Sequence, residues 1–159
     1  MNTTLANMSG ISNGKVIDTD KEYAVAEEYR KKLKTKCPTV EQNVGNLSGG
    51  NQQKVLLAKW MFAEPDILIL DEPTRGIDVG AKVEIYQLMN QLKKQGIAVM
   101  FVSSEMPEVM GVADRIIVMC DGRITGEVMA KETTQNDILK YATSFENKLG
   151  SQSQNNKEE

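Results

Sequence analysis

The 159-residue sequence predicts an α/β domain with a parallel sheet and a C-terminal β-hairpin. Apolar runs at 67–70 and 97–103 alternate with amphipathic stretches, and strand–helix alternation is typical of parallel sheets. Asp121-Gly122 lies between two further apolar runs, and this dipeptide favours a two-residue hairpin turn because both positions need positive φ. Hydrophobic residues make up 40% and charged residues 26%, which is ordinary for one globular domain of this length.

The first half of the chain predicts a loop followed by two helices. Residues 1–18 are rich in Asn, Ser, Thr and Gly and predict a loop. A helix is predicted from Thr19 to Lys34, capped by Asp18, Thr19 or Asp20, because apolar residues recur on one face. That face consists of Tyr23, Ala26, Tyr29 and Leu33. A second helix begins at Ser48-Gly49-Gly50, with Val55, Leu56, Trp60 and Met61 facing the domain and Gln52, Gln53 and Lys54 nearer the surface.

The second half predicts the sheet, two more helices and the hairpin. The uninterrupted apolar run 67–70 is typical of a strand buried on both faces. A helix over 81–94, closed by Gly96, places Ile85, Leu88, Met89 and Leu92 inward. A short helix near 107–112, strands at 115–120 and 123–128, and a last helix through Tyr141 capped by Thr133 or Thr134 complete the order.

Charge and cysteine usage exclude several classes of function. The net charge of −3 gives no basic face for nucleic acid, so no nucleic-acid partner is expected. The basic cluster Arg30, Lys31, Lys32, Lys34 and Lys36 is more often a solvated helix face than a polyanion site. Two cysteines without a CxxC motif, and no histidine, argue against a zinc site and suit a reducing compartment. The sequence shows neither a signal peptide nor a run of about 18 apolar residues.

The Ser48-Gly49-Gly50 segment has the composition of an anion-binding helix start. Glycines let backbone amides approach a phosphate, and the helix presents its positive N-terminus. The Ser48 hydroxyl adds a donor, and Asn51 or Gln52 can add an amide. The alternative is an ordinary Ser N-cap followed by two glycines.

Asp71 and Glu72 end the apolar strand, at the sheet edge where ligands of such folds bind. Asp71 can hold Mg²⁺ through a water, and Glu72 can orient and polarise an attacking water. The alternative is a plain strand end before Pro73. Asp78 precedes the next helix, where it would ordinarily be a helix cap.

Together these strings resemble ABC-type ATPases: Leu47–Lys54 is similar to the signature loop and Ile67–Thr74 to the Walker B segment. With Arg75–Lys82 and Val102–Pro107, they resemble the C-terminal ATP-binding half of ribose-, galactose- and xylose-type monosaccharide importers. The resemblance implies a partial P-loop NTPase fold, the ABC nucleotide-binding domain. It also implies ATP and Mg²⁺ as cofactors, Asp71 as the residue that holds the metal, and Asp78 in a D-loop that contacts a partner. Glu72, Asp71 and Ser104 would be catalytic, and Ser48, Gly49, Gly50, Asn51, Gln52 and Asp78 would bind the nucleotide.

The same resemblance implies partners and a location. They are a second ATP-binding half that carries a P-loop, transmembrane permease subunits and, indirectly, a periplasmic or extracellular sugar-binding protein. The chain would be peripheral at the cytoplasmic face of the cell membrane. It would contribute to the ATP hydrolysis that drives monosaccharide uptake.

Two departures from the family pattern shape the prediction. Ser104 stands where most ABC ATPases have a histidine, and serine is too short and uncharged to make the same γ-phosphate contact. The P-loop is missing: the nearest candidate, Gly10–Val16, is one residue short, ends in Val and follows no apolar strand. We therefore expect a fold that is truncated before the signature loop and lacks the P-loop strand, with no ATPase activity by itself. Ser48, Gly50 and Asp78 would serve a nucleotide held by the partner.

The organisation predicted from these motifs has three parts. Residues 1–46 are a remnant of the helical subdomain and the loop leading into it, 47–145 hold the signature helix and Walker B core, and 146–159 are a disordered tail. Exposed apolar strand edges predict poor solubility or marginal stability. One alternative is a truncated or regulatory fragment without turnover. A DNA-repair or chromosome-organising ATPase is disfavoured because the sequence has neither heptads nor CxxC.

Overall fold

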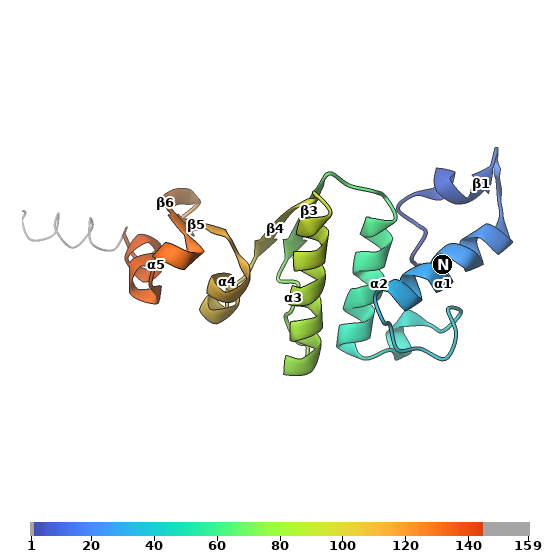
Figure 1. Ribbon diagram of the computed structural model, residues 1–159, viewed down its shortest axis with the longest axis horizontal. Coiled ribbons are helices and arrows are strands. Elements are labelled where there is room, and N and C mark those ends of the chain that lie inside the picture. Colours follow the sequence, from blue (N-terminus) through green and yellow to red (C-terminus); the bar gives the residue numbers. More distant parts are fainter. Residues whose placement is uncertain (1, 145–159) are drawn as a thin grey trace, which may run out of the picture. The chain divides into compact units, whose positions relative to one another are not determined.

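The computed structural model describes residues 2–144. The chain divides into two compact units, Met1–Val102 and a second unit that begins at Ser103. The two units are described separately below (Figure 1).

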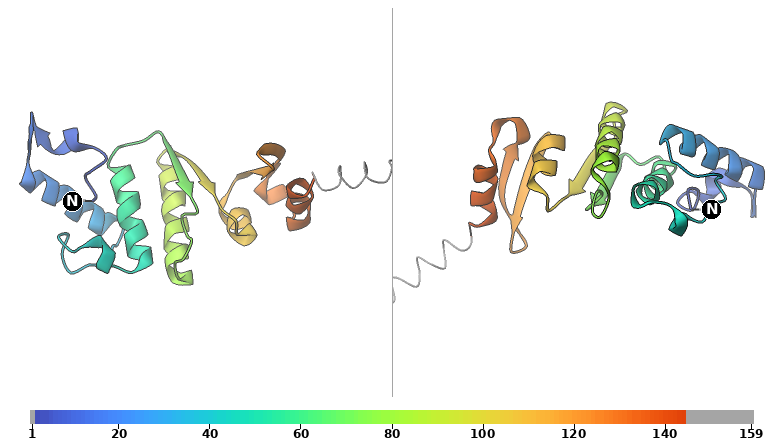
Figure 2. Two further views of the ribbon diagram at one scale, coloured as in Figure 1. Left: turned by 180° about the vertical axis from the view of Figure 1, so that it is seen from behind. Right: turned by 90° about the horizontal axis from the view of Figure 1, so that it is seen from below.

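The first unit combines three helices with a parallel two-stranded sheet. The helices are α1 (Thr19–Lys32), α2 (Gly49–Met61) and α3 (Val79–Lys94), and the strands are β3 (Ile67–Asp71) and β4 (Ala98–Val102). Strands β3 and β4 pair in parallel from Ile67 with Ala98 to Asp71 with Val102. Helix α3 packs beside β4, and α2 lies next to α3 in every view (Figures 1 and 2). This arrangement brings the starts of α2 and α3 into one region.

The second unit is a β-hairpin packed on two short helices. It consists of α4 (Met106–Val112), β5 (Arg115–Cys120), β6 (Arg123–Met129), the 3-10 helix η3 (Ala130–Glu132) and α5 (Gln135–Ala142). Its core is formed by Ile116, Val118, Ala130 and Ile138. Gly126 is needed where α5 crosses the hairpin, because a Cβ there would come within 2.4 Å of the Tyr141 ring.

Several predictions from local sequence are confirmed. Ile85, Leu88, Met89 and Leu92 are all buried on α3, and Gly96 follows that helix with φ +91°. Asp121 and Gly122 have φ +48° and +73°, as the hairpin turn requires. Asp18 caps α1 by accepting from the Lys21 N–H. Thr134 caps α5 in a capping box with Asp137.

The first eighteen residues are more ordered than the loop prediction allowed. They form the 3-10 helix η1 (Met8–Ile11) and a small antiparallel hairpin of β1 (Ser12–Asn13) and β2 (Val16–Ile17). Thr4 and Ile11 are fully buried. The Gly10–Val16 candidate is therefore part of a hairpin, which differs from the strand–loop–helix of a P-loop. Helix α1 ends two residues earlier than predicted, and its expected inward residue Tyr23 is 44% exposed.

The apolar stripe predicted for α2 is confirmed only in part: Met61 is buried and Val55 is half-buried, whereas Leu56 and Trp60 do not lie on the buried face. Leu56 and Trp60 are about half exposed, whereas Gly50, Lys54, Leu57, Ala58 and Met61 are buried. The buried positions follow the spacing of one helix face. The sequence placed Lys54 nearer the surface, and this placement is wrong, because the Lys54 side chain is buried.

The β3 strand is buried on one face only, so the expectation of two buried faces is wrong for the described structure. Leu68 and Leu70 are buried, whereas Ile67 and Ile69 are 62% and 63% exposed. On β4, Met100 and Val102 are also about half exposed. Helix α3 therefore covers one face of the sheet and the other face presents apolar side chains.

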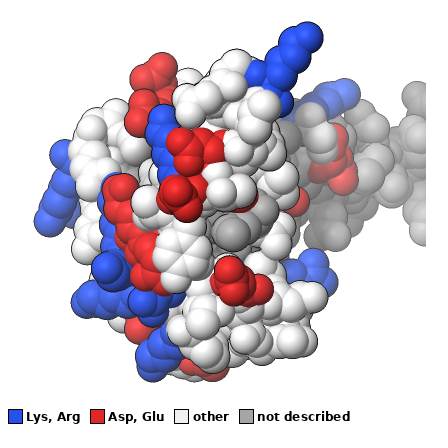
Figure 3. All heavy atoms as spheres, turned by 90° about the vertical axis from the view of Figure 1, so that its right-hand side faces the viewer, with Lys and Arg blue, Asp and Glu red and all other residues white. Residues whose placement is uncertain are grey.

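Three remaining observations concern the surface and the ends of the chain. Acidic and basic side chains are interspersed on the face that contains α1 (Figure 3). None of the helices in the described residues is long and apolar enough to cross a membrane. The predicted tail, 146–159, lies outside the described residues.

Candidate functional site

The Ser48 loop begins α2 in an unusual way. Ser48 occupies the N-cap position with φ −61° and ψ 155°, but within the described residues its side chain makes no cap hydrogen bond to the helix backbone. An α-helix leaves its first N–H groups without intrahelical partners, and these groups form the positive end of the helix. The start of α2 therefore presents backbone donors beside an exposed hydroxyl.

The two amide side chains that follow are bonded within the chain. Asn51 Nδ2 donates to Ser48 Oγ at 2.8 Å, and Asn51 Oδ1 accepts from the Lys36 N–H at 2.8 Å. Gln52 Nε2 donates to the Leu47 carbonyl at 2.8 Å. Their predicted role in nucleotide binding stays a prediction, since both amides hold the loop itself here.

The two glycines let the loop pack closely on the segment before α3. A Cβ at Gly49 would lie 3.3 Å from Ile77 Cγ2, and a Cβ at Gly50 would lie 2.6 Å from Ala81 Cβ. The second distance is shorter than carbon atoms tolerate. The structure thus brings the signature-like loop against the segment that contains Asp78.

Asp78 caps α3, as the local sequence predicted. Its Oδ1 accepts from the Ala81 N–H at 2.9 Å. The carboxylate is exposed, so it retains acceptor capacity toward solvent. Contact with a partner chain stays a prediction.

The two acids lie at the carboxyl end of β3. Asp71 is exposed and pairs in register with Val102. Glu72 has φ +45°, in the left-handed region that non-glycine residues rarely adopt, and its N–H donates to the Val102 carbonyl at 2.9 Å. Pro73 and Thr74 are fully buried directly afterwards. The strained backbone at Glu72 is therefore followed directly by buried residues. Strained backbone conformations of this kind are common at functional sites.

Lys54 is a buried cation that the sequence analysis placed at the surface. Its Nζ lies 2.5 Å from a Glu84 carboxylate oxygen on α3 and donates to the Lys34 carbonyl after α1 at 3.2 Å. The hydrogen bond and the charge of Lys54 hold the pKa of Glu84 below its ordinary value. One side chain thus joins the three helices around the candidate loop.

Ser104 belongs to the second unit, where it is exposed. Its neighbour Ser103 donates to Glu108 at 2.6 Å, and Ser103 Oγ accepts from the Glu105 N–H at 3.1 Å. These contacts order the chain on both sides of Ser104 and leave its side chain at the surface.

The donor set of the first unit suits a nucleotide with magnesium. Backbone N–H groups and the Ser48 hydroxyl are donors for phosphate oxygens. The described residues contain no group of three or more acidic, histidine or cysteine side chains that could hold a metal alone. The exposed Asp71 carboxylate is an oxygen ligand of the kind that Mg²⁺ prefers.

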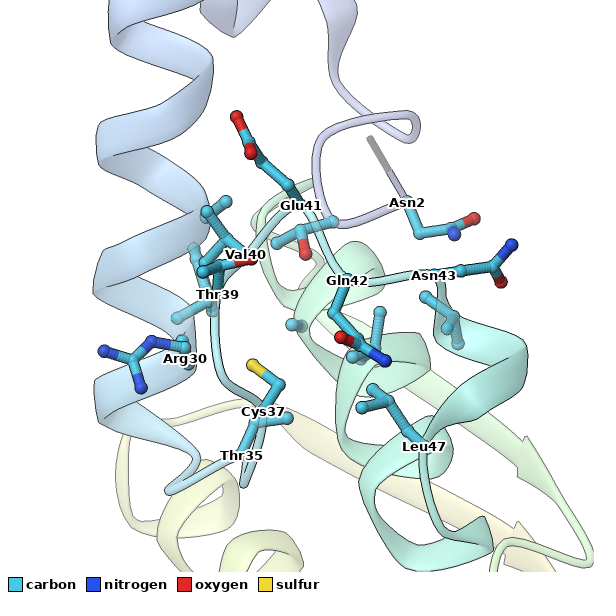
Figure 4. Close-up of a pocket in the computed structure, with 16 residues that line it drawn as sticks. Asn2, Arg30, Thr35, Cys37, Thr39, Val40, Glu41, Gln42, Asn43 and Leu47 are labelled. Carbon is cyan, nitrogen blue, oxygen red and sulfur yellow. The ribbon is translucent and has the colours of Figure 1, made fainter.

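A separate pocket of about 340 Å³ lies between α1, residues 35–47 and α2 (Figure 4). Cys37 and Gln42 are among its lining residues, and Cys37 is a free thiol. None of the predicted site residues lines it. The pocket therefore does not mark the predicted chemistry.

Sequence reasoning missed the residues that support the loop: Lys36, Lys54, Ala81 and Glu84. One signal was present, because Asn51 and Lys54 are three residues apart and so share a helix face. Both contact the 34–36 segment. The contacts of Ala81 and Glu84 depend on how α3 packs against α2, which has no local signature.

Residues 2–75 match the family model described as ABC transporter. The chain is 55% identical over 142 residues to an L-arabinose transport ATP-binding protein, AraG, of Geobacillus stearothermophilus, covering 89% of this chain and 28% of the relative. It is 55% identical over 142 residues to the xylose import protein XylG of Geobacillus kaustophilus, with the same coverage. It is 50% identical over 147 residues to the ribose import protein RbsA of Clostridium tetani, covering 92% and 29%. The chain thus spans less than a third of the length of these relatives.

Solved structures show the same fold. A metal-chelate type ABC transporter in an inward-facing conformation matches with a TM-score of 0.72 at 19% identity, covering 90% of this chain and 56% of the other. A dimeric bacterial ABC transporter cassette matches with a TM-score of 0.63 at 26% identity, covering 75% and 51%. The same cassette is known in a dimeric post-hydrolysis state bound to ADP and Pi, with the same scores. The predicted fold class is confirmed.

Proposed function

Because this chain carries part of an ABC transporter domain and has the ABC ATPase fold, we propose that it is an energy-coupling component of a monosaccharide importer. It supplies the Ser48 loop to ATP that is held by a second ATP-binding half with a P-loop. Names of the relatives, which include arabinose, xylose and ribose import proteins, support the substrate class.

One observation carries the proposal. Ser48 caps α2 without a side-chain bond to the helix backbone within the described residues, so its hydroxyl and the first N–H groups of α2 remain available. Glycines at the next two positions keep the loop free of side chains. A γ-phosphate is a strong acceptor for such donors, because hydrogen bonds to ionised groups are short and strong.

The acidic residues take a different role. Asp71 would hold Mg²⁺, and the ion would supply charge neutralisation at the phosphates. Glu72 orients the attacking water and accepts its proton. In this assignment Asp71, Glu72 and Ser104 serve a nucleotide on their own side, and Ser48, Gly50 and Asp78 serve the nucleotide of the partner.

The partners follow from the same proposal. They are the P-loop half, transmembrane permease subunits and, through these, a sugar-binding protein outside the cell. The chain is then peripheral at the cytoplasmic face of the membrane. Within it, residues 1–46 form part of a helical subdomain, and 47–145 form the signature and Walker B core.

The proposal is tested by adding an ATP-binding half that carries a P-loop. We expect the purified chain to bind no Mg²⁺–ATP alone, and ATP turnover to appear when an intact P-loop half of a monosaccharide importer is added. Ser48→Arg should reduce that turnover by at least ~10²-fold, the cost of losing an anion donor at the reacting phosphate. Glu72→Gln should reduce it less, because Glu72 serves the site that lacks a P-loop.

Gln53→Arg is the matched control, since it adds the same charge two residues from Asn51 on the same helix. It should leave turnover unchanged. Equal losses from Ser48→Arg and Glu72→Gln would contradict the division of roles. Tight binding of Mg²⁺–ATP by the chain alone would contradict the need for a partner P-loop.

A second candidate is a regulatory fragment without turnover. Ser104 in place of the histidine that most ABC ATPases have, and the hairpin at residues 12–17, favour it. Absence of turnover in the mixture, together with nucleotide-dependent association of the two proteins, would select this candidate.

A further inference from the structure

We infer that Asn51 is a positioning residue: its side-chain amide fixes the Ser48 hydroxyl so that the hydroxyl proton faces outward, toward a phosphate. This inference rests on the proposed function, because it names the residue that prepares Ser48 for the partner's nucleotide. It assigns Asn51 a role different from direct nucleotide contact.

The orientation of the Asn51 amide follows from its two partners. The Lys36 N–H can only donate, so the amide atom 2.8 Å from it must be the oxygen. The amide nitrogen then faces Ser48 Oγ at 2.8 Å and donates to it. The usual ambiguity between the two ends of an asparagine amide is thus removed by one backbone donor.

The bond from Asn51 determines what the Ser48 hydroxyl can do. A serine hydroxyl has one proton and two acceptor lone pairs. Because Ser48 Oγ accepts from Asn51, its own proton is not directed at the amide and can donate elsewhere. Ser48 is exposed, so that direction opens to the surface of the loop.

The same bond keeps the start of α2 open. An N-cap serine normally accepts from a backbone N–H of the first turn. Here the Asn51 side chain, at the third helical position, donates to Ser48 Oγ in place of a backbone N–H. Within the described residues Ser48 makes no bond of its own to the helix backbone. The backbone N–H groups of Gly50 and Asn51, which an N-cap side chain would otherwise bind, are therefore kept for an anion.

Asn51 is itself anchored from outside the loop. The Lys36 backbone follows α1 and lies on the segment whose Lys34 carbonyl accepts from buried Lys54. Lys54 in turn pairs with Glu84 on α3. The direction of the Ser48 hydroxyl thus depends on residues 34–36, which are held in place by Lys54. If these residues were flexible, Asn51 would not hold the hydroxyl in one direction.

Two substitutions separate positioning from packing. Asn51→Leu removes both hydrogen bonds at similar volume. Asn51→Asp keeps the shape and the acceptor for Lys36, but it presents an acceptor to Ser48, which turns the hydroxyl proton inward. Gln53→Glu adds the same charge to the same helix and serves as control for Asn51→Asp.

The first measurement needs no nucleotide. Three-bond couplings from the Ser48 Hβ protons in the full chain report the χ1 rotamer. We expect single-rotamer values in the wild type and in Gln53→Glu, and averaged values in Asn51→Leu. Hydrogen exchange at the Lys36 amide should become faster in Asn51→Leu. Unchanged couplings in Asn51→Leu would overturn the inference.

The second measurement is Mg²⁺–ATP turnover with the added P-loop half. We expect kcat to fall about tenfold in Asn51→Leu, the size of one net hydrogen bond, with KM for ATP nearly unchanged. Asn51→Asp should fall at least as far, and Gln53→Glu should match the wild type. Averaged couplings with an unchanged kcat would also overturn the inference.

The outcomes distinguish this inference from the proposed function. If the wild-type mixture shows no turnover, the proposed function fails and the couplings alone decide the role of Asn51. If Asn51→Leu does not fold, Asn51→Asp supplies the decision, since turnover equal to the wild type in that variant contradicts the positioning role.

Discussion

Lys54 shows how a single buried charge organises the residues around the candidate loop. Its side chain is 6% exposed, and its two partners come from α3 and from the segment after α1. A buried ammonium without partners is strongly destabilising, so Glu84 and the Lys34 carbonyl determine whether α2 packs in this position.

The Lys54–Glu84 pair predicts a pH dependence of stability. Glu84 is 47% exposed, so water screens the pair and we expect Glu84→Gln to lower the free energy of unfolding by only about 0.5–1 kcal/mol at pH 7. The folded-state pKa of Glu84 is lowered below 4.5, so the wild-type advantage is present above about pH 4.5. It is lost as the pH falls through the lower, folded pKa. Urea titrations between pH 7 and pH 3 measure this difference.

Glu41→Gln is the control for that titration, because Glu41 is exposed and lies in the loop after α1. Glu41→Gln should have the same free energy of unfolding as the wild type between pH 7 and pH 3. A Glu84→Gln deficit that stayed constant down to pH 3 would contradict the assigned cause.

At the level of elements, the contact between α2 and α3 depends on the absence of a side chain at Gly50. The Cβ of an alanine there would overlap Ala81 Cβ at 2.6 Å. Alanine is otherwise preferred over glycine inside a helix by about 1 kcal/mol. The glycine therefore serves the packing of the two helices.

This contact predicts a compensating pair of substitutions. Gly50→Ala should lower the free energy of unfolding by about 1–3 kcal/mol, the usual cost of overpacking. Adding Ala81→Gly should recover most of that loss. Gly111→Ala is the control, because no atom lies within 4 Å of a Cβ there and α4 should gain stability. Denaturant unfolding of the single and double variants measures the coupling energy between the two positions. If the two changes in the free energy of unfolding simply added up in the double variant, the contact would be contradicted.

At the scale of the whole molecule, each unit presents an apolar sheet surface. In the first unit Ile67, Ile69 and Met100 are at least half exposed. In the second, Met119 and Ile124 on the hairpin are 62% and 68% exposed. Exposed apolar strands are sites of aggregation. The chain should therefore associate at concentrations where an ordinary domain stays monomeric.

Two neighbouring positions on β3 test this expectation. Ile69→Thr removes an exposed apolar side chain and keeps a β-branched residue suited to strands. It should reduce binding of the dye ANS and raise the concentration at which light scattering begins, with Tm nearly unchanged. Leu68→Thr, at a buried position, should instead lower stability by about 2–4 kcal/mol. Equal losses of Tm in both variants would contradict the exposure of Ile69.

The sequence predicted most elements because their signals are local. The inward face of α3, the Asp121-Gly122 turn and the Thr134 cap each depend on residues within a few positions of one another. The motifs also predicted the fold class. The burial of Lys54 on α2 was missed because the partners of Lys54 are 20 and 30 residues away.

The candidate site was predictable only in part. The residue types at Ser48, Asp71, Glu72 and Asp78 suggested their chemistry, and the cap at Asp78 follows from the local sequence. The Lys36 contact of Asn51 required the path of the chain after α1. The exposed face of β3 was missed because an uninterrupted apolar run does not show how many layers cover it.

Close contact at Gly50 gives the loop a mechanical property. Where a backbone meets a methyl group directly, no side-chain torsion can absorb a displacement, so the contact is stiff. A shift of the α3 start, where Asp78 lies, is transmitted to the start of α2 with little attenuation. A displacement of the turn at Asp78 is therefore expected to displace Ser48 as well, through the contact between Ala81 and Gly50.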